Sequence, residues 1–255
     1  MKPVFGLSLR SAGAEVKAPP EFCRMLELPG EVLDDASVRE WSRMCADRNI
    51  EWGVRDLLDP GLSRRLAEEN DTLRIEAFRK LETRIGRATA NGAEWASFDL
   101  DAGRAVEDPD YASSLSAVLL QIGGVLAGAS GKLPLLLPVR IPAPGRAAEP
   151  ERLLKFRHAL PFPGVRFVFE LHPHEPGALE WTGRELLRFE ARWWRVCFDP
   201  ASGNKLSAGA LSRFLDFGEE APEAMRLFFS PESSGDDDMV LKQLSETAEK
   251  WEETK

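Results

Sequence analysis

Short apolar runs recur at an almost regular interval along the whole chain, and this rhythm limits the possible folds more than any other feature. Eight such runs are present, rich in Val, Leu, Ile and Phe. The first starts at Val4 and the last at Met225, so the average spacing is roughly 32 residues. Most lack polar alternation, as expected of parallel strands covered on both faces. The runs are Val4–Leu9, Cys23–Leu28, Ile50–Asp56, Trp95–Asp101, Leu133–Ile141, Val165–Leu171, Arg195–Asp199 and Met225–Ser230.

Helical patterns lie between most of these runs. Apolar residues three and four apart predict a helix from about Asp35 to Arg48, with Ser37 and Glu40 as a capping box at its start. The connection 10–21 is too short and too rich in Pro and Gly for a full first helix, and 142–150 is a predicted loop. Further helices are predicted around Phe78–Ala88, Leu115–Val125, Leu186–Phe189, Leu211–Leu215 and Val240–Trp251.

A strand followed by a helix, repeated eight times, predicts an α/β fold, namely a single (β/α)8 TIM barrel. We expect one domain over residues 1–255, with the first helix missing or vestigial. An open, doubly wound sheet also alternates strands and helices and is the main alternative. Eight units in a chain of 255 residues favour the closed barrel.

Composition excludes several classes of protein. Hydrophobic residues make up 43% and charged residues 29% of the chain, which is the balance of an ordinary globular protein. A formal net charge of −9 argues against a nucleic-acid partner, because such a surface needs clustered positive charge. No run approaches the ~18 apolar residues of a membrane-spanning helix, and the first residues lack a secretory pattern. We therefore predict a cytoplasmic protein without a membrane partner.

The sequence also allows predictions about its cysteine residues and about two of its tryptophan residues. Cys23, Cys45 and Cys197 cannot all pair with one another, and none belongs to a CxxC motif. Buried free thiols are expected. Trp193 and Trp194 indicate either packing at the end of a helix or a subunit contact.

The ends of the eight runs carry the chemistry, because the active site of a (β/α)8 barrel lies at the carboxyl ends of its strands. Carboxylates dominate there, with arginines and histidines between them. The residues are Ser8 and Arg10, Glu27, Arg55 and Asp56, Asp99 and Asp101, Arg140, Glu170 with His172 and His174, Asp199, and Glu232.

The densest of these ends lies in Phe167–Glu175, which reads FVFELHPHE. Glu170 and His172 are two residues apart and share one face of the strand. They suit either a divalent metal or a general base with a partner that tunes it, or else an interior salt bridge. Asp199 precedes Pro200 and is predicted as a base or metal ligand, with a turn residue as the alternative.

Four other residues are predicted to bind substrate. Glu27 closes the second run and either contacts substrate or caps the next segment. Asp99 and Asp101 share a face, so one suits a metal or a sugar hydroxyl while the other pairs with Arg104. Arg140 either clamps an anionic or hydroxylated substrate or pairs with a carboxylate at the end of the barrel.

Three segments resemble the xylose isomerase-like TIM-barrel superfamily, which includes sugar phosphate isomerases and epimerases and endonuclease IV-like enzymes. They are VFELHP ending at Pro173, RVCFDPA starting at Arg195, and CRMLELP starting at Cys23. The resemblance implies a carbohydrate-like ligand. It also implies a divalent metal (Mn, Mg or Zn) held by Glu170, His172 and Asp199.

The sequence departs from the pattern of this superfamily in two ways. A histidine commonly follows the aspartate, whereas Ser202 and Asn204 follow Asp199 here. Counting also places Glu170 on the sixth strand and Asp199 on the seventh, whereas the superfamily usually has them on the fifth and sixth. The fifth run ends in Arg140 instead.

These observations predict a sugar isomerase or epimerase acting on a carbohydrate or polyol, with or without metal assistance. Glu170 would remove a proton next to a carbonyl group, and His172 or a second carboxylate, Asp199, would return it. The alternative is a non-catalytic barrel that binds a carbohydrate or a protein. An endonuclease IV-like nuclease is disfavoured, because such enzymes need several metal-binding histidines and this chain has three histidines in total.

We expect Glu170 to lie among other carboxylates. We therefore predict that Glu170→Gln leaves the stability of the protein unchanged or slightly higher.

Overall fold

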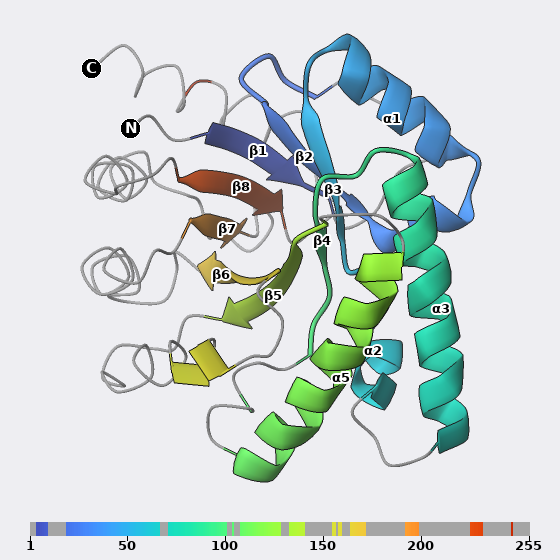
Figure 1. The fold of residues 1–255 in the computed structure, drawn as a ribbon. Helices are drawn as coiled ribbons and strands as arrows, with labels where there is room; N and C mark the ends of the chain where they lie inside the picture. The colour runs from blue at the N-terminus through green and yellow to red at the C-terminus, as the bar shows by residue number, and fades with distance from the viewer. Residues whose placement is uncertain are drawn as a thin grey trace.

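Eight parallel strands close into a barrel in the computed structural model of the chain (Figure 1). They follow one another around the barrel in sequence order, and β1 pairs with β8 to close it. The predicted (β/α)8 fold is therefore confirmed, and the open sheet is excluded. The structure describes residues 4–9, 19–66, 71–100, 104, 108–128, 133–140, 155–156, 158–159, 164–171, 192–198, 225–231 and 246.

Each of the eight apolar runs overlaps one strand. Most boundaries differ from the prediction by one or two residues, but β4 is much shorter than its run. The strands are β1 Val4–Ser8, β2 Met25–Pro29, β3 Glu51–Arg55, β4 Ala96–Ser97, β5 Leu135–Arg140, β6 Val165–Leu171, β7 Trp193–Phe198 and β8 Arg226–Pro231.

Helices cover the outside of the first half of the barrel (Figure 1). They are η1 Gly30–Asp34, α1 Ser37–Asp47, α2 Pro60–Leu66, α3 Asp71–Ala90 and α5 Pro109–Gly128. The predicted helices in α1, α3 and α5 are confirmed. Helix α2 was not predicted, because seven residues are too few to display helical periodicity. The predictions for 10–18 and 142–150, and for the helices near Leu186, Leu211 and Val240, lie outside the described residues.

The predicted capping box of α1 is wrong. The residue before the helix is Ala36, which has helical backbone angles and provides no side-chain cap. Ser37 is already the first helical residue, so its hydroxyl is not in the capping position. Instead, Asp35 Oδ1 accepts a hydrogen bond from the backbone N–H of Ser37 at 3.3 Å.

Successive side chains along each strand point in turn to the outside and to the inside of the barrel, and both regions are largely apolar. One set of side chains packs outward against the helices and forms the main core, which includes Leu26, Val54, Leu137 and Trp194. The alternate residues form a smaller, separate cluster that fills the bottom of the barrel interior. Its members are Met25, Trp95, Leu136, Val168 and Phe228, with Val4 and Trp193 packed against them.

Trp95 is the largest member of this inner cluster, and it lies against Gly53. A Cβ atom at Gly53 would lie 2.3 Å from two atoms of the indole ring. The ring also contacts Trp193 and Phe228, with centroid distances of 5.3 and 5.7 Å. Trp193 and Trp194 are therefore strand residues that pack inside and outside the barrel, and the alternative that they pack at the end of a helix is wrong.

Of the described helices, α5 (window 109–127) is long and apolar enough to cross a membrane. Its residues Leu115, Leu119 and Ile122 nevertheless pack into the main core.

We predict that Gly53→Ala lowers the free energy of unfolding by about 1–3 kcal/mol, because the added methyl group overpacks the ring of Trp95. Gly86→Ala in α3 is the matched control, because no atom lies within 4 Å of its added Cβ. That change should stabilise the protein by about 0.5–1 kcal/mol through helix propensity. Urea unfolding of the three proteins measures both effects, and equal stability of the two variants would contradict the packing.

Candidate active site at the carboxyl end of the barrel

A layer of polar side chains lies above the apolar floor of the barrel interior. These residues occupy the same inward-facing positions as the floor, two residues further along each strand. All but Glu170 are buried, so the carboxyl half of the interior is polar although water is largely excluded. The members are Ser8, Glu27, Arg55, Ser97, Glu170, Arg195 and Ser230.

Arg195 and Glu27 form a bidentate ion pair across this layer. Arg195 Nε donates to Glu27 Oε2 at 2.8 Å, and Arg195 Nη2 donates to Glu27 Oε1 at 2.9 Å. Both side chains are completely buried. Ser97 and Trp95 complete the pair, since Arg195 Nη2 donates to Ser97 Oγ at 2.6 Å and Trp95 Nε1 to Glu27 Oε1 at 3.3 Å. This geometry joins β2, β4 and β7 through charge-assisted hydrogen bonds.

The pairing keeps both groups charged despite their burial. Burial alone would raise the pKa of Glu27, but the charge and hydrogen bonds of Arg195, with smaller contributions from Arg55 and Ser8, bring it below 4.5. For Arg195 burial opposes the charge, yet Glu27 and Glu170 raise the pKa of the guanidinium above its ordinary value. The pair is therefore a fixed, internally compensated charge rather than a group that titrates at neutral pH.

Glu170 is the carboxylate of the layer that solvent reaches. Its side chain is 21% exposed, whereas that of Glu27 is fully buried. Arg195 Nη1 donates to Glu170 Oε1 at 3.2 Å, and Arg55 Nη2 lies 3.7 Å from the same oxygen. Glu170 thus faces solvent on one side and two guanidinium groups on the other. It is the described acid–base group best placed to meet a ligand at the mouth of the barrel.

Arg55 is the second guanidinium of the layer, at the end of β3. Its Nη1 donates to Ser8 Oγ at 3.0 Å and also to Ser230 Oγ. Its side chain is 4% exposed, and its Nε has no hydrogen-bond acceptor in the part of the chain that the structure describes, although Asp56 Oδ2 lies 3.3 Å away. Asp56 follows directly with a φ of 51°, a left-handed conformation that is uncommon for residues other than glycine.

The structure brings together two of the predicted site residues. Glu27 and Glu170 both contact Arg195. Arg140 ends β5 beside Glu170 in the strand register. Asp99 is exposed, two residues after β4. His172, Asp101 and Asp199, with His174 and Glu232, lie outside the described residues.

Arg195 was missed as a site residue because the seventh strand was predicted to start there. The strand starts at Trp193, so Trp193, Arg195 and Cys197 point to the same side. The sequence did offer a signal, which is a charged residue inside an apolar strand, directly preceded by two tryptophans. Cys23, Cys45 and Cys197 are buried free thiols, as predicted.

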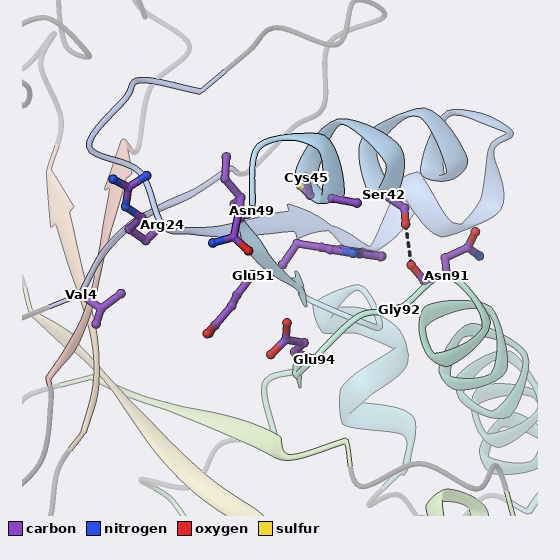
Figure 2. A pocket seen from close by; sticks show the side chains of 12 residues that line it. Val4, Arg24, Ser42, Cys45, Asn49, Glu51, Asn91, Gly92 and Glu94 are labelled. Atoms are coloured by element: carbon purple, nitrogen blue, oxygen red, sulfur yellow. Dashed lines mark hydrogen bonds between the residues drawn. The ribbon is translucent and has the colours of Figure 1, made fainter.

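A separate pocket of about 460 Å³ opens at the opposite, amino-terminal end of the barrel (Figure 2). Glu51 and Glu94 lie together in its lining, and burial followed by the charge of Glu51 raises the pKa of Glu94. Arg226 compensates part of this charge, since its Nη1 donates to Glu51 Oε2 at 2.6 Å. In (β/α)8 barrels this end serves stability rather than chemistry, so the candidate site remains at the carboxyl end.

Neither Glu27 nor Glu170 fits a divalent metal in this arrangement. Both oxygens of Glu27 accept hydrogen bonds from Arg195, and Oε1 of Glu170 lies beside two guanidinium groups. A cation bound to either carboxylate would face a fixed positive charge at close range. His172 and Asp199, the other predicted ligands, lie outside the described residues. No group of three or more potential ligands occurs among the residues that the structure describes.

Known structures share this fold over nearly the whole chain. A D-tagatose 3-epimerase-like protein has a TM-score of 0.65 at 14% identity and covers 100% of this chain and 99% of its own. A xylose isomerase domain protein from Alicyclobacillus acidocaldarius has a TM-score of 0.57 at 13% identity, covering 97% and 98%. An AP endonuclease of family 2 from Brucella melitensis has a TM-score of 0.60 at 12% identity, covering 95% and 98%.

At these identities the similarities show a shared (β/α)8 fold, which is the fold that the resemblance to the xylose isomerase-like superfamily implies. The matched structures include both sugar epimerases and an endonuclease, so the fold does not by itself select a reaction. No protein-family model matches the sequence, and the search of curated proteins found no match.

We predict that Glu27→Leu lowers the free energy of unfolding by about 3–5 kcal/mol, because it leaves Arg195 buried without a counter-charge. The double variant Glu27→Leu/Arg195→Met should recover most of this loss, since it removes both charges. Urea unfolding of the two single variants and the double variant measures the coupling. Equal losses from Glu27→Leu and the double variant would show that the pair is not the source of the effect.

The same pair predicts a pH dependence. The pKa of Glu27 is lower in the folded protein than its ordinary value of 4.5. The stabilisation is therefore complete above about pH 4.5 and is lost as the pH falls through the pKa of the folded state. The melting temperature of the wild type should drop more steeply below about pH 4.5 than that of the double variant. Parallel acid profiles would contradict the assignment.

Glu170→Gln should also lower stability, by about 1–2 kcal/mol. The sequence suggested the opposite, because Glu170 was expected among carboxylates, but its described partners are Arg195 and Arg55. Glu82→Gln on the exposed face of α3 is the matched control and should change stability little. A Glu170→Gln variant as stable as Glu82→Gln would restore the original expectation.

Proposed function

We propose that the chain is a sugar isomerase or epimerase that moves a proton next to a carbonyl group with Glu170 as the base. The observation that carries this proposal is the position of Glu170, a partly exposed carboxylate at the mouth of a closed barrel. The fold is shared with structures named as sugar epimerases, which supports a carbohydrate-like substrate.

The proposed step needs three properties of the site. The Glu170 carboxylate accepts the proton from the carbon beside the carbonyl, and the electrons of the broken C–H bond form an enediolate. A positive charge close to the developing oxyanion stabilises it, and Arg55 and Arg195 already lie beside Glu170. Return of a proton to the same carbon on the opposite face gives an epimer, and return to the neighbouring carbon gives an isomer.

The return of the proton is assigned to His172 or Asp199, as the sequence suggested. In the sequence His172 directly follows β6 and Asp199 directly follows β7. Glu27 does not take this role in the proposal. Its two oxygens are fully occupied by Arg195 and it is completely buried, so its part is to fix Arg195 beside Glu170. Arg140, Asp99 and Asp101 remain proposed substrate-binding residues.

A non-catalytic barrel that binds a carbohydrate or a protein is the second candidate. The observation that favours it is the bidentate Arg195–Glu27 pair, which fills the centre of the barrel and satisfies its own charges. Such a barrel would bind ligands at the mouth without exchanging protons with them.

Exchange of carbon-bound hydrogen in D2O separates the two candidates. The protein is incubated with D-fructose, D-tagatose and D-psicose, with and without Mn2+, and the signal of the proton next to the carbonyl is followed by 1H NMR. We predict loss of that signal with at least one ketose. Glu170→Gln should lower the exchange rate by about 100-fold or more, because it removes the general base.

Glu82→Gln is the control, because it makes the same chemical change on an exposed helix face far along the chain from the mouth. It should exchange at the wild-type rate. Exchange that persists in Glu170→Gln would remove Glu170 from the role of base. Binding of a ketose without exchange in the wild type would favour the non-catalytic barrel.

A further inference from the structure

Arg55 carries an unused hydrogen-bonding edge inside an otherwise satisfied polar layer. In Arg195 the edge formed by Nε and Nη2 binds the carboxylate of Glu27 in a bidentate manner. The same edge of Arg55 has no hydrogen-bond acceptor among the described residues: Nε is unpartnered and Nη2 approaches Glu170 only to 3.7 Å. A buried N–H group without a hydrogen-bond acceptor, such as Nε of Arg55, is costly, which points to a ligand oxygen as the missing acceptor.

Two carboxylates flank this edge. Asp56 Oδ2 lies 3.3 Å from Nε, without the geometry of a hydrogen bond, and Glu170 Oε1 lies beyond Nη2. Asp56 is 44% exposed, so its side chain can yield its position to a ligand oxygen. The edge therefore offers two N–H donors between two carboxylate acceptors.

The position of Asp56 is built into the fold. Its φ of 51° is in the left-handed region, and the next residue is anchored, since Leu57 N donates to Ser97 O at 2.7 Å. Gly30 permits the close approach, because a Cβ atom there would lie 2.3 Å from the carbonyl oxygen of Asp56. Uncommon backbone conformations of this kind persist where the surrounding structure imposes them, often at ligand sites.

The charges of the side chains around this edge, linked by ion pairs, indicate which ligand fits. Two guanidinium groups, Arg55 and Arg195, face three carboxylates, Glu27, Glu170 and Asp56, so one negative charge is in excess. This excess charge would repel a carboxylate or a phosphate group on the ligand. A neutral molecule with neighbouring carbonyl and hydroxyl oxygens accepts from Arg55 and donates its hydroxyl hydrogens to Asp56 and Glu170.

We infer that the Nε–Nη2 edge of Arg55 binds two neighbouring oxygens of a neutral α-hydroxycarbonyl or polyol, and that Asp56 excludes the corresponding acids. This deepens the proposed function and rests on it for the reaction, but its binding claim can be tested alone. In the reaction Arg55 would stabilise the oxyanion that forms when Glu170 removes the proton from the carbon beside the carbonyl. Arg55 is therefore a catalytic residue of the proposed step.

Equilibrium binding of D-fructose, D-tagatose, D-psicose and the anion D-gluconate, measured by ligand-detected NMR in EDTA, tests the inference. The wild type should bind a ketose more tightly than gluconate. Arg55→Lys keeps the charge but loses the bidentate edge, so ketose affinity should fall by about tenfold or more. Asp56→Asn tolerates the same backbone conformation and should raise gluconate affinity by about tenfold relative to the ketose.

Arg226→Lys is the control, because Arg226 pairs with Glu51 at the opposite end of the barrel. It should bind like the wild type. Arg55→Lys that binds normally, or Asp56→Asn with an unchanged preference, would overturn the inference. If Arg55→Lys does not fold, the Asp56→Asn result decides alone.

Deuterium exchange by the same proteins, measured with and without Mn2+, distinguishes failure of the inference from failure of the proposed function. Arg55-dependent binding without exchange in the wild type supports the binding site and rejects the isomerase. Exchange in the wild type that Arg55→Lys leaves unaltered supports the isomerase and rejects Arg55 as its oxyanion group. A wild type that neither binds nor exchanges any of the three ketoses rejects both.

Discussion

The arrangement of the barrel interior depends on the ion pair between Arg195 and Glu27. Two opposite charges are placed where no water reaches them, and each is satisfied by the other and by Ser97 and Trp95. A buried pair of this kind contributes little net stability compared with apolar side chains, but removal of one partner is expensive. The pair therefore ties β2, β4 and β7 together across the barrel, and Arg195 also holds Glu170.

The order of layers inside the barrel follows from this constraint. The floor is filled by aromatic and aliphatic side chains, with Gly53 leaving room for the ring of Trp95. The next layer is polar, and Arg195 uses its remaining Nη1 to hold Glu170 at the edge of solvent. Arg55 is held in the same layer by two serines and has hydrogen-bonding capacity to spare. The mouth thus combines a compensated interior with exposed groups that can still act on a ligand.

Positive charge at the mouth comes from side chains. In the proposed reaction the guanidinium groups of Arg55 and Arg195 supply the stabilisation of an oxyanion, and Glu170 supplies the base. This assignment differs from the metal set that the resemblance implied, because the described carboxylates already have cationic partners.

The sequence by itself indicated a parallel α/β architecture, because apolar runs without polar alternation suit strands that are covered on both faces. The eight units favoured closure into a barrel over an open sheet. The sequence also placed Glu170 and Glu27 at strand ends. The tertiary structure alone decided what these residues contact. Arg195 lies 168 positions from Glu27 in the chain, and Arg55 lies 175 from Ser230. No local pattern encodes such contacts, because they arise only when the closed sheet brings the inward faces of distant strands together.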